Sequence, residues 1–180
     1  MTLFLYNNLN IGRWLNMRAF MTIGTLKFLK AFIEKHPNID FYFMNNMYES
    51  STLVYYEHKR KKVFAAGKTY DIVFSVGTLQ EEGFVAMETI PVTKEGQPLF
   101  EQQIQKQLNK FEEMSNLFAF RLLKLRRGQD YILLSQWKSP AYYETWQQKR
   151  EKTIVKQPAY FASRPFTTHY LMANLDDAEK

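Results

Sequence analysis

The chain has 180 residues, of which 46% are hydrophobic and 23% charged, proportions typical of a globular protein. It contains no cysteine, which excludes disulfides, thiolate metal sites and cysteine nucleophiles and favours a cytoplasmic location. The formal net charge of +6 is explained first by solubility, with binding of an anionic ligand or of nucleic acid as the alternatives. No apolar run approaches the roughly 20 residues that a membrane span needs.

The start of the chain predicts an irregular leader, then a strand and a helix. Asparagines interrupt any regular period over residues 1–16, so Met17 is a candidate for the true start. Residues 17–25 predict a strand. Residues 25–37 predict a helix, because apolar residues recur every three and four positions and Thr25 is a suitable N-cap.

The next segment predicts mostly β structure. Two runs rich in β-branched and aromatic residues flank residues 45–51 and predict a hairpin. Residues 61–67 predict a further short strand. Residues 68–77 fit either a helix or an apolar strand, and we expect a short helix because Tyr70 and Phe74 fall at helical spacing.

The second half of the chain predicts six elements in the order β-α-β-β-α-β, which is the ferredoxin-like motif. The predicted strands cover residues 81–93, 116–125, 130–137 and 163–174. The first helix follows a cap at Thr93. Five apolar residues lie at helical spacing on one of its faces: Leu99, Phe100, Ile104, Leu108 and Phe111.

Aromatic residues gather around the second helix of this half. Ser139 is its predicted cap, Pro140 its first residue, and Tyr142, Tyr143 and Trp146 its buried face. Trp137 ends the strand before it. The alternation of that strand favours Trp137 as a core residue, with a wall of a ligand site as the alternative.

These elements predict an α+β fold in which two ferredoxin-like lobes pack within one chain. The first half repeats the opening element order of the second half. Residues 17–80 are expected to form the N-terminal lobe and residues 81–175 the C-terminal lobe, with a tail at 176–180.

Few polar residues suggest a site by spacing alone. His36, His58 and His169 are not paired with other ligands at metal-binding spacing, so each is expected to be structural. The basic run at residues 57–62 fits a solvated turn better than a nucleic-acid surface, because no regularly spaced exposed aromatics accompany it.

The second half resembles the Isd-type heme-degrading monooxygenases of the antibiotic-biosynthesis-monooxygenase superfamily. The resemblance rests on the helix start VTKEGQPLFE, the strand ending in Trp137, the helix segment ETWQQ and the segment SRPFTTHY. The segments FMTIGTLKFLKAFIEKHP and VFAAGKTYDI are similar to the N-terminal lobe of the two-lobed HmoB-like branch. TRAP-type staphylococcal proteins share that layout.

The resemblance implies two ferredoxin-like lobes that form a dimeric-α/β-barrel-like fold within a monomer. It also implies that heme is both cofactor and substrate and lies between the sheet and the helices of a lobe. The reaction would use O2 and an external reductant, with electrons from a donor that the sequence does not identify.

The resemblance also implies roles for individual residues. Trp137 matches a tryptophan that presses on the porphyrin and ruffles it. Thr89 stands where the family has an asparagine that donates to the oxygen ligand, and Lys156 stands where it has the histidine that binds iron. The remaining expected heme-binding residues are Phe111 and the alternative iron ligands His169 and Tyr160.

Because the family asparagine and histidine are both replaced, two functions stay open. The first is a heme-degrading monooxygenase that opens the porphyrin and releases iron. The alternative is a non-catalytic protein of the same fold that binds a ligand or signals to a protein partner.

Overall fold

The computed structural model describes residues 16–150 and 158–173. The leader predicted at residues 1–16 and the tail at 176–180 therefore lie almost wholly outside the described residues. The strands are β1 (Arg18–Gly24), β2 (Tyr42–Asn46), β3 (Thr52–His58), β4 (Lys68–Gly77), β5 (Phe84–Pro91), β6 (Leu117–Leu125), β7 (Asp130–Trp137) and β8 (Phe166–Ala173). The helices are α2 (Leu26–Ile33), α3 (Gln97–Gln105), α4 (Leu108–Glu112), α5 (Pro140–Lys149) and the short 3-10 helix η1 (Pro158–Tyr160).

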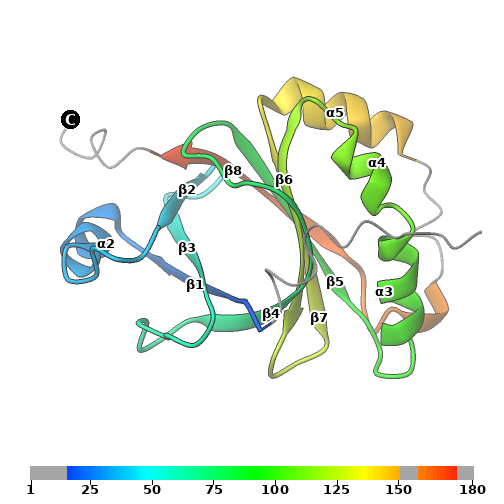
Figure 1. Ribbon diagram of the computed structural model, residues 1–180, viewed down its shortest axis with the longest axis horizontal. Helices are drawn as coiled ribbons and strands as arrows, with labels where there is room; N and C mark the ends of the chain where they lie inside the picture. The colour runs from blue at the N-terminus through cyan, green and yellow to red at the C-terminus, as the bar shows by residue number, and fades with distance from the viewer. Residues whose placement is uncertain (1–15, 151–157, 174–180) are drawn as a thin grey trace, which may run out of the picture.

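The eight strands close into one barrel in the order β1-β3-β2-β8-β5-β7-β6-β4 (Figure 1). Every pairing is antiparallel. The mixed α+β fold expected from the sequence is confirmed. The β-α-β-β-α-β order of the second half is confirmed as well, with α3 and α4 together in the place of the first helix.

Each half of the chain contributes four adjacent strands in the same spatial order. The first half gives β4-β1-β3-β2 and the second gives β8-β5-β7-β6. In the first half, residues 59–67 join β3 to β4 without a helix. The pairs β2–β8 and β4–β6 join the two halves, so the predicted division into lobes at residue 80 stays a prediction.

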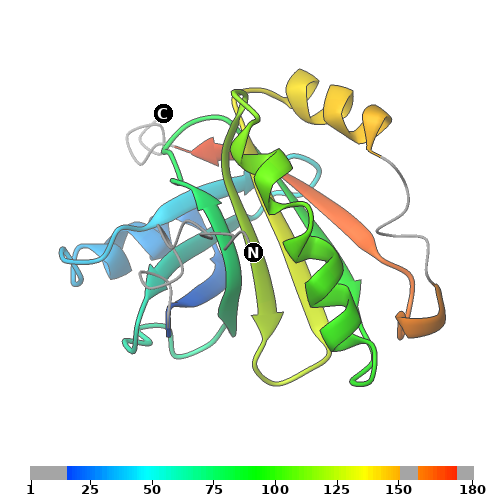
Figure 2. The ribbon, with the colours of Figure 1, turned by 45° about the vertical axis from the view of Figure 1, so that its right-hand side comes forward.

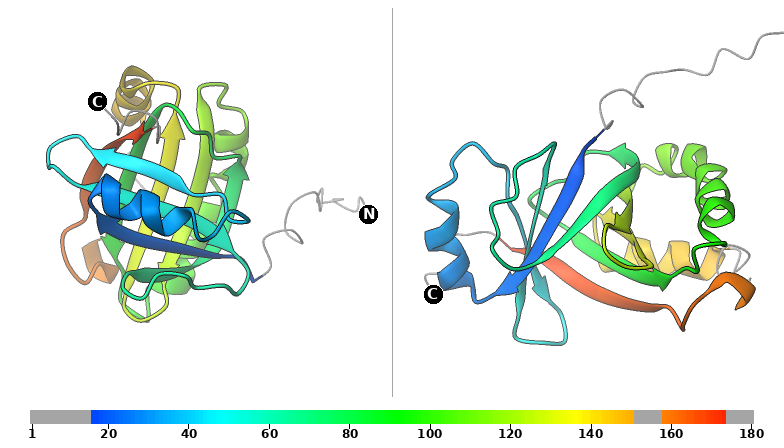
Figure 3. Two further views of the ribbon diagram at one scale, coloured as in Figure 1. Left: turned by 90° about the vertical axis from the view of Figure 1, so that its left-hand side faces the viewer. Right: turned by 90° about the horizontal axis from the view of Figure 1, so that it is seen from below.

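The helices cover two opposite sides of the barrel (Figures 2 and 3). Helix α2 packs on the first half, and α3, α4 and α5 pack on the second. Strand alternation separates the apolar side chains into a cluster inside the barrel and clusters beneath the helices. The second half therefore has a layer of side chains between its sheet and its helices.

The short helix expected over residues 68–77 is wrong, because this segment is strand β4. Its pairing with β6 shifts between Ile72 and Phe74, which marks a β-bulge. Tyr70 and Ile72 face the barrel interior, whereas Phe74 and Val76 lie with the cluster beneath the helices. Because of the bulge, the apolar side chains before it and after it lie on opposite faces of the strand. This interruption of the two-residue alternation produced the spacing that we interpreted as helical.

The short strand expected over residues 61–67 is also wrong, because this segment has no strand pairing. Two backbone groups of this segment form hydrogen bonds with the hydroxyl of Tyr56 instead of with a neighbouring strand. This hydroxyl donates to the carbonyl of Lys61 at 3.0 Å and accepts from the N–H of Val63 at 2.8 Å.

One of the three predicted caps differs from the structure. Thr25 is confirmed as the N-cap residue of α2, although its side chain makes no capping hydrogen bond. The N-cap of α3 is Gly96 rather than Thr93, whose carbonyl accepts hydrogen bonds from the N–H groups of Gly96 and Gln97. The predicted start of α5, with Ser139 as N-cap and Pro140 first, is confirmed in position.

Candidate functional site

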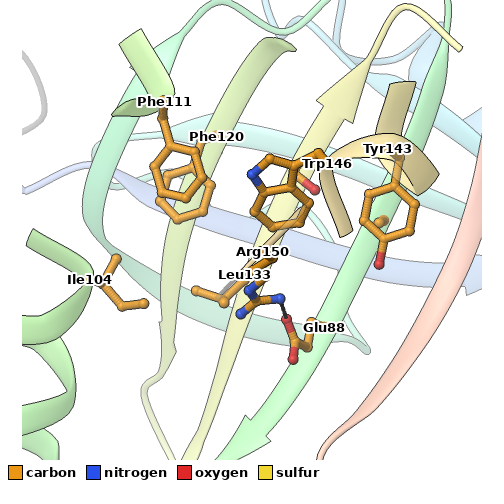
Figure 4. A pocket seen from close by; sticks show the side chains of 10 residues that line it. Glu88, Ile104, Phe111, Phe120, Leu133, Tyr143, Trp146 and Arg150 are labelled. Carbon is orange, nitrogen blue, oxygen red and sulfur yellow. Dashed lines mark hydrogen bonds and ion pairs between the residues drawn. The ribbon is translucent and has the colours of Figure 1, made fainter. Parts of the chain in front are cut away.

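A small cavity lies between the sheet and the helices of the second half (Figure 4). Its volume is about 20 Å³, which is room for about one water molecule. Most of its walls are apolar, and its two charged groups are the carboxylate of Glu88 and the guanidinium of Arg150. The cavity lies in the layer where the resemblance places a ligand.

Regular alternation brings the lining side chains together. Strand β5 presents Ala86 and Glu88 to the cavity, and β7 presents Leu133 and Ser135, each pair two residues apart. Helix α5 presents Tyr143 and Trp146 from one face, and Arg150 follows at its C-cap. The cavity therefore has a floor formed by the two strands and a wall formed by α5 and its C-cap residue.

Flat aromatic rings form one side of the cavity. Phe111 of α4 stacks on Phe120 of β6, with ring centroids 4.2 Å apart and an interplanar angle of 14°. Trp146 lies 6.2 Å from Phe111, centroid to centroid. Phe111 was expected to contact heme, and the structure places it in the cavity wall (Figure 4).

An ion pair closes the cavity on another side. Arg150 Nη1 lies 2.7 Å from Glu88 Oε2, and the two side chains are only 13% and 15% exposed. The guanidinium also lies over the indole of Trp146, 5.1 Å from the ring centroid, which is within the range of a cation–π contact. Arg150 thus holds the end of α5 against strand β5.

Trp137 does not line this cavity. It is 2% exposed and packs with Phe84, Ala86 and Tyr143, as its predicted core position requires. Its Nε1 is buried and has no hydrogen-bond partner among the described residues. Trp146, whose ring centroid is 5.3 Å from that of Trp137, is the indole that borders the cavity.

Thr89 lies on the opposite face of β5 from the cavity residues Ala86 and Glu88. Val85 and Met87, which lie four and two residues before Thr89 and so share its face of the strand, belong to the cluster inside the barrel. Glu88 is therefore the polar residue that β5 offers to the cavity. Sequence reasoning missed Glu88 and Trp146 as site residues, although the helical spacing had placed Trp146 on the buried face of its helix.

His169 of β8 is the best-placed predicted iron ligand among the described residues, although it does not line the cavity. Its Nε2 is buried without a hydrogen-bond partner among the described residues, and its ring contacts Tyr143, which does line the cavity, at 5.6 Å between centroids. Burial lowers the pKa of His169 from its ordinary 6.5. The negative charge of Glu144 acts in the opposite direction but is the smaller effect. This environment favours the neutral imidazole, which is the form that binds metals.

The other two predicted ligands are less available. Tyr160 donates its hydroxyl hydrogen to Gln103, and burial raises its phenol pKa. Its ring packs near Phe100, with centroids 6.5 Å apart, away from the cavity lining. Lys156 lies outside the described residues.

No family model matches this sequence. Over 129 residues the chain is 26% identical to a heme-degrading monooxygenase from Listeria monocytogenes, a match covering 72% of this chain and 76% of that protein. The chain is a homologue of this heme-degrading monooxygenase. The resemblance stated from the sequence is thereby confirmed.

Solved structures agree on the fold of this monooxygenase homologue. A ferredoxin-fold protein from L. monocytogenes, related to antibiotic biosynthesis monooxygenases, superposes with a TM-score of 0.76 at 24% identity, covering 88% of this chain and 95% of that one. A major regulator of staphylococcal pathogenesis superposes with a TM-score of 0.77 at 18% identity, covering 87% and 99%. None of the described helices has the length and apolar character needed to cross a membrane.

Proposed function

We propose that the protein binds heme between α5 and the sheet of its second half and opens the porphyrin oxidatively, using O2 and an external reductant. The observation that carries the proposal is the flat-walled apolar cavity in a homologue of a heme-degrading monooxygenase. Heme is the substrate in this proposal, and its ring would lie against Phe111 and Trp146.

The size of the cavity sets a condition on this function. A cavity of about 20 Å³ is far below the roughly 300–1,000 Å³ of sites that enclose small-molecule ligands. Helix α5 must therefore move away from β5 and β7 for heme to enter. The contacts that hold it to the floor include side-chain contacts of Tyr143, Trp146 and Arg150, and the strand pairings of the barrel do not involve α5.

A larger hollow elsewhere suits heme less well. It has a volume of about 710 Å³ and is lined by residues 39–42 and 79–82. Three of its residues, Asp40, Glu81 and Glu82, are acidic. Negative charge of this kind repels the two propionate groups of heme, whereas the smaller cavity includes a cationic side chain.

Hemin titration tests the proposal. Saturable binding with a new Soret band, followed by loss of the band when ascorbate is added in air, is the expected result. A chelator such as ferrozine should detect released ferrous iron in step with that loss. A stable band in the presence of reductant and O2 would exclude turnover.

For the iron ligand we propose His169, because its buried Nε2 has no hydrogen-bond partner in the part of the chain that the structure describes and its neutral form is favoured. The ring of Tyr143 would have to move with α5 for the imidazole to reach the ligand. Spectra of His169→Ala and Lys156→Ala with bound hemin decide between the two candidates. If neither substitution changes the spectrum, neither side chain is the ligand.

The second candidate function is a non-catalytic one, in ligand binding or signalling. The closed cavity favours it, and the fold shared with a staphylococcal regulator is consistent with it. A hemin titration without saturable binding would support this function over the first.

A further inference from the structure

The two partners of the Glu88–Arg150 ion pair lie on opposite walls of the candidate site. Glu88 is on strand β5 in the floor, and Arg150 is at the end of helix α5 in the wall that must move. Opening the site separates these walls. The opening motion therefore breaks the ion pair.

Breaking this pair without replacement is costly, because both side chains are about 85% buried or more. Among the described residues, Glu88 is the only hydrogen-bonding partner of the Arg150 side chain. A ligand that opens the site leaves this cation unpaired unless the ligand brings an anion of its own.

We propose that Arg150 is the carboxylate-recognition residue of the site: a carboxylate at the edge of a planar ligand takes the place of Glu88 on the guanidinium. Glu88 is then an internal competitor that keeps the empty site closed. This inference rests on the proposed function and adds a requirement that the ligand be a planar acid rather than any flat apolar molecule.

The position of Arg150 over Trp146 supports this arrangement. The guanidinium lies over the same indole that borders the cavity, at 5.1 Å from its centroid. Both side chains line the cavity, so a flat ligand that enters it would lie close to the guanidinium. Arginine binds carboxylates through two parallel N–H···O bonds, a geometry that a carboxylate at the edge of such a ligand can match.

The test compares two ligands on four proteins. The ligands are protoporphyrin IX, which has two carboxylates, and its dimethyl ester, which has the same ring and none. The proteins are wild type, Glu88→Gln, Arg150→Gln and the control Lys149→Gln, which removes an exposed cation from the same helix. Porphyrin absorption and tryptophan quenching give each dissociation constant.

We expect wild type and Lys149→Gln to bind the acid at least about tenfold more tightly than the ester. Glu88→Gln should bind the acid several-fold more tightly than wild type, because it removes the competitor. Arg150→Gln should bind acid and ester about equally. The Glu88→Gln comparison and the wild-type preference for the acid remain decisive if Arg150→Gln fails to fold.

Two different failures can be told apart. If wild type binds acid and ester equally, or if Glu88→Gln and Arg150→Gln bind the acid as wild type does, the role of Arg150 is overturned and the porphyrin site stands. If neither wild type nor Glu88→Gln binds protoporphyrin or hemin, the proposed function fails and this inference fails with it.

Discussion

Arg121 on β6 and Glu57 on β3 form an ion pair at 2.8 Å inside the barrel, although their strands are not neighbours. The side chains are 2% and 12% exposed. The same Glu57 oxygen accepts the hydroxyl hydrogen of Tyr55, and Arg121 also donates to the carbonyls of Val76 and Phe120. This network links the two halves of the chain through the barrel interior.

Removing one partner of this pair should strongly destabilise the protein. Arg121→Met leaves the Glu57 carboxylate buried without its cation, and we expect a loss of roughly 3–5 kcal/mol in the free energy of unfolding. Urea denaturation of both proteins measures the difference. The control Arg126→Met removes a pair with Asp71 whose side chains are 43% and 50% exposed, and should cost at most about 1 kcal/mol. Equal effects would contradict the network.

The two neighbouring tryptophans should differ in their effect on ligand binding. Trp146→Ala removes an aromatic wall of the cavity and should weaken hemin binding by about tenfold or more. Trp137→Phe changes a core residue outside the lining, so it should leave the affinity within about twofold. Titration of both variants with hemin gives the comparison. The reverse order of effects would restore Trp137 as the ligand-facing residue.

His169 should make the stability of the fold depend on pH. Its pKa is lowered in the folded protein, so below the ordinary value of 6.5 the unfolded chain binds more protons than the folded one. The stabilisation is complete above pH 6.5 and is lost as the pH falls through the folded pKa. We expect His169→Gln to flatten this part of the curve of unfolding free energy against pH.

The control for this measurement is Tyr48→Phe, which keeps the ring beside His169 and adds no charge. It should follow the wild-type curve. A His169→Gln curve that also follows wild type would show that burial of the imidazole does not govern this pH range.

Gly96 should tolerate no larger residue. A Cβ atom there would lie 2.3 Å from Tyr160 Cβ, closer than any van der Waals contact. Gly96→Ala therefore displaces Tyr160 and its contacts, at a cost of roughly 1–3 kcal/mol in unfolding free energy. At Gly24 the atoms nearest to a new Cβ belong to the Leu29 side chain, the closest at 3.4 Å, so Gly24→Ala should be neutral or slightly stabilising. Equal urea midpoints for the two variants would contradict the close approach.

Much of the fold could be predicted from the sequence, because strand alternation and helix starts are local signals. Alternation divides the side chains of β7 between two faces, and the structure places Leu134 in the barrel interior and Leu133 beneath the helices. The bulge in β4 could not be predicted, since the extra residue is set by pairing with β6, about 50 residues away in the chain.

The candidate site was less predictable for a similar reason. The pattern places Trp137 and Trp146 in the same aromatic layer but does not say which of them reaches the cavity. It also cannot pair Glu88 with Arg150, which are 62 residues apart. Such pairings depend on how α5 lies on the sheet, and no local period encodes that.

The closure of the barrel limits how another protein could associate with this chain. Each of the eight described strands has a hydrogen-bonded neighbour on both sides, although β4 pairs with β1 only over residues 68–71 and β8 pairs with β2 only over residues 170–173. An incoming strand, a common way for peptides to join a sheet, would therefore find free backbone groups only along the short unpaired stretches of these strands. A partner would bind this chain mainly through side chains of the helices and connecting loops.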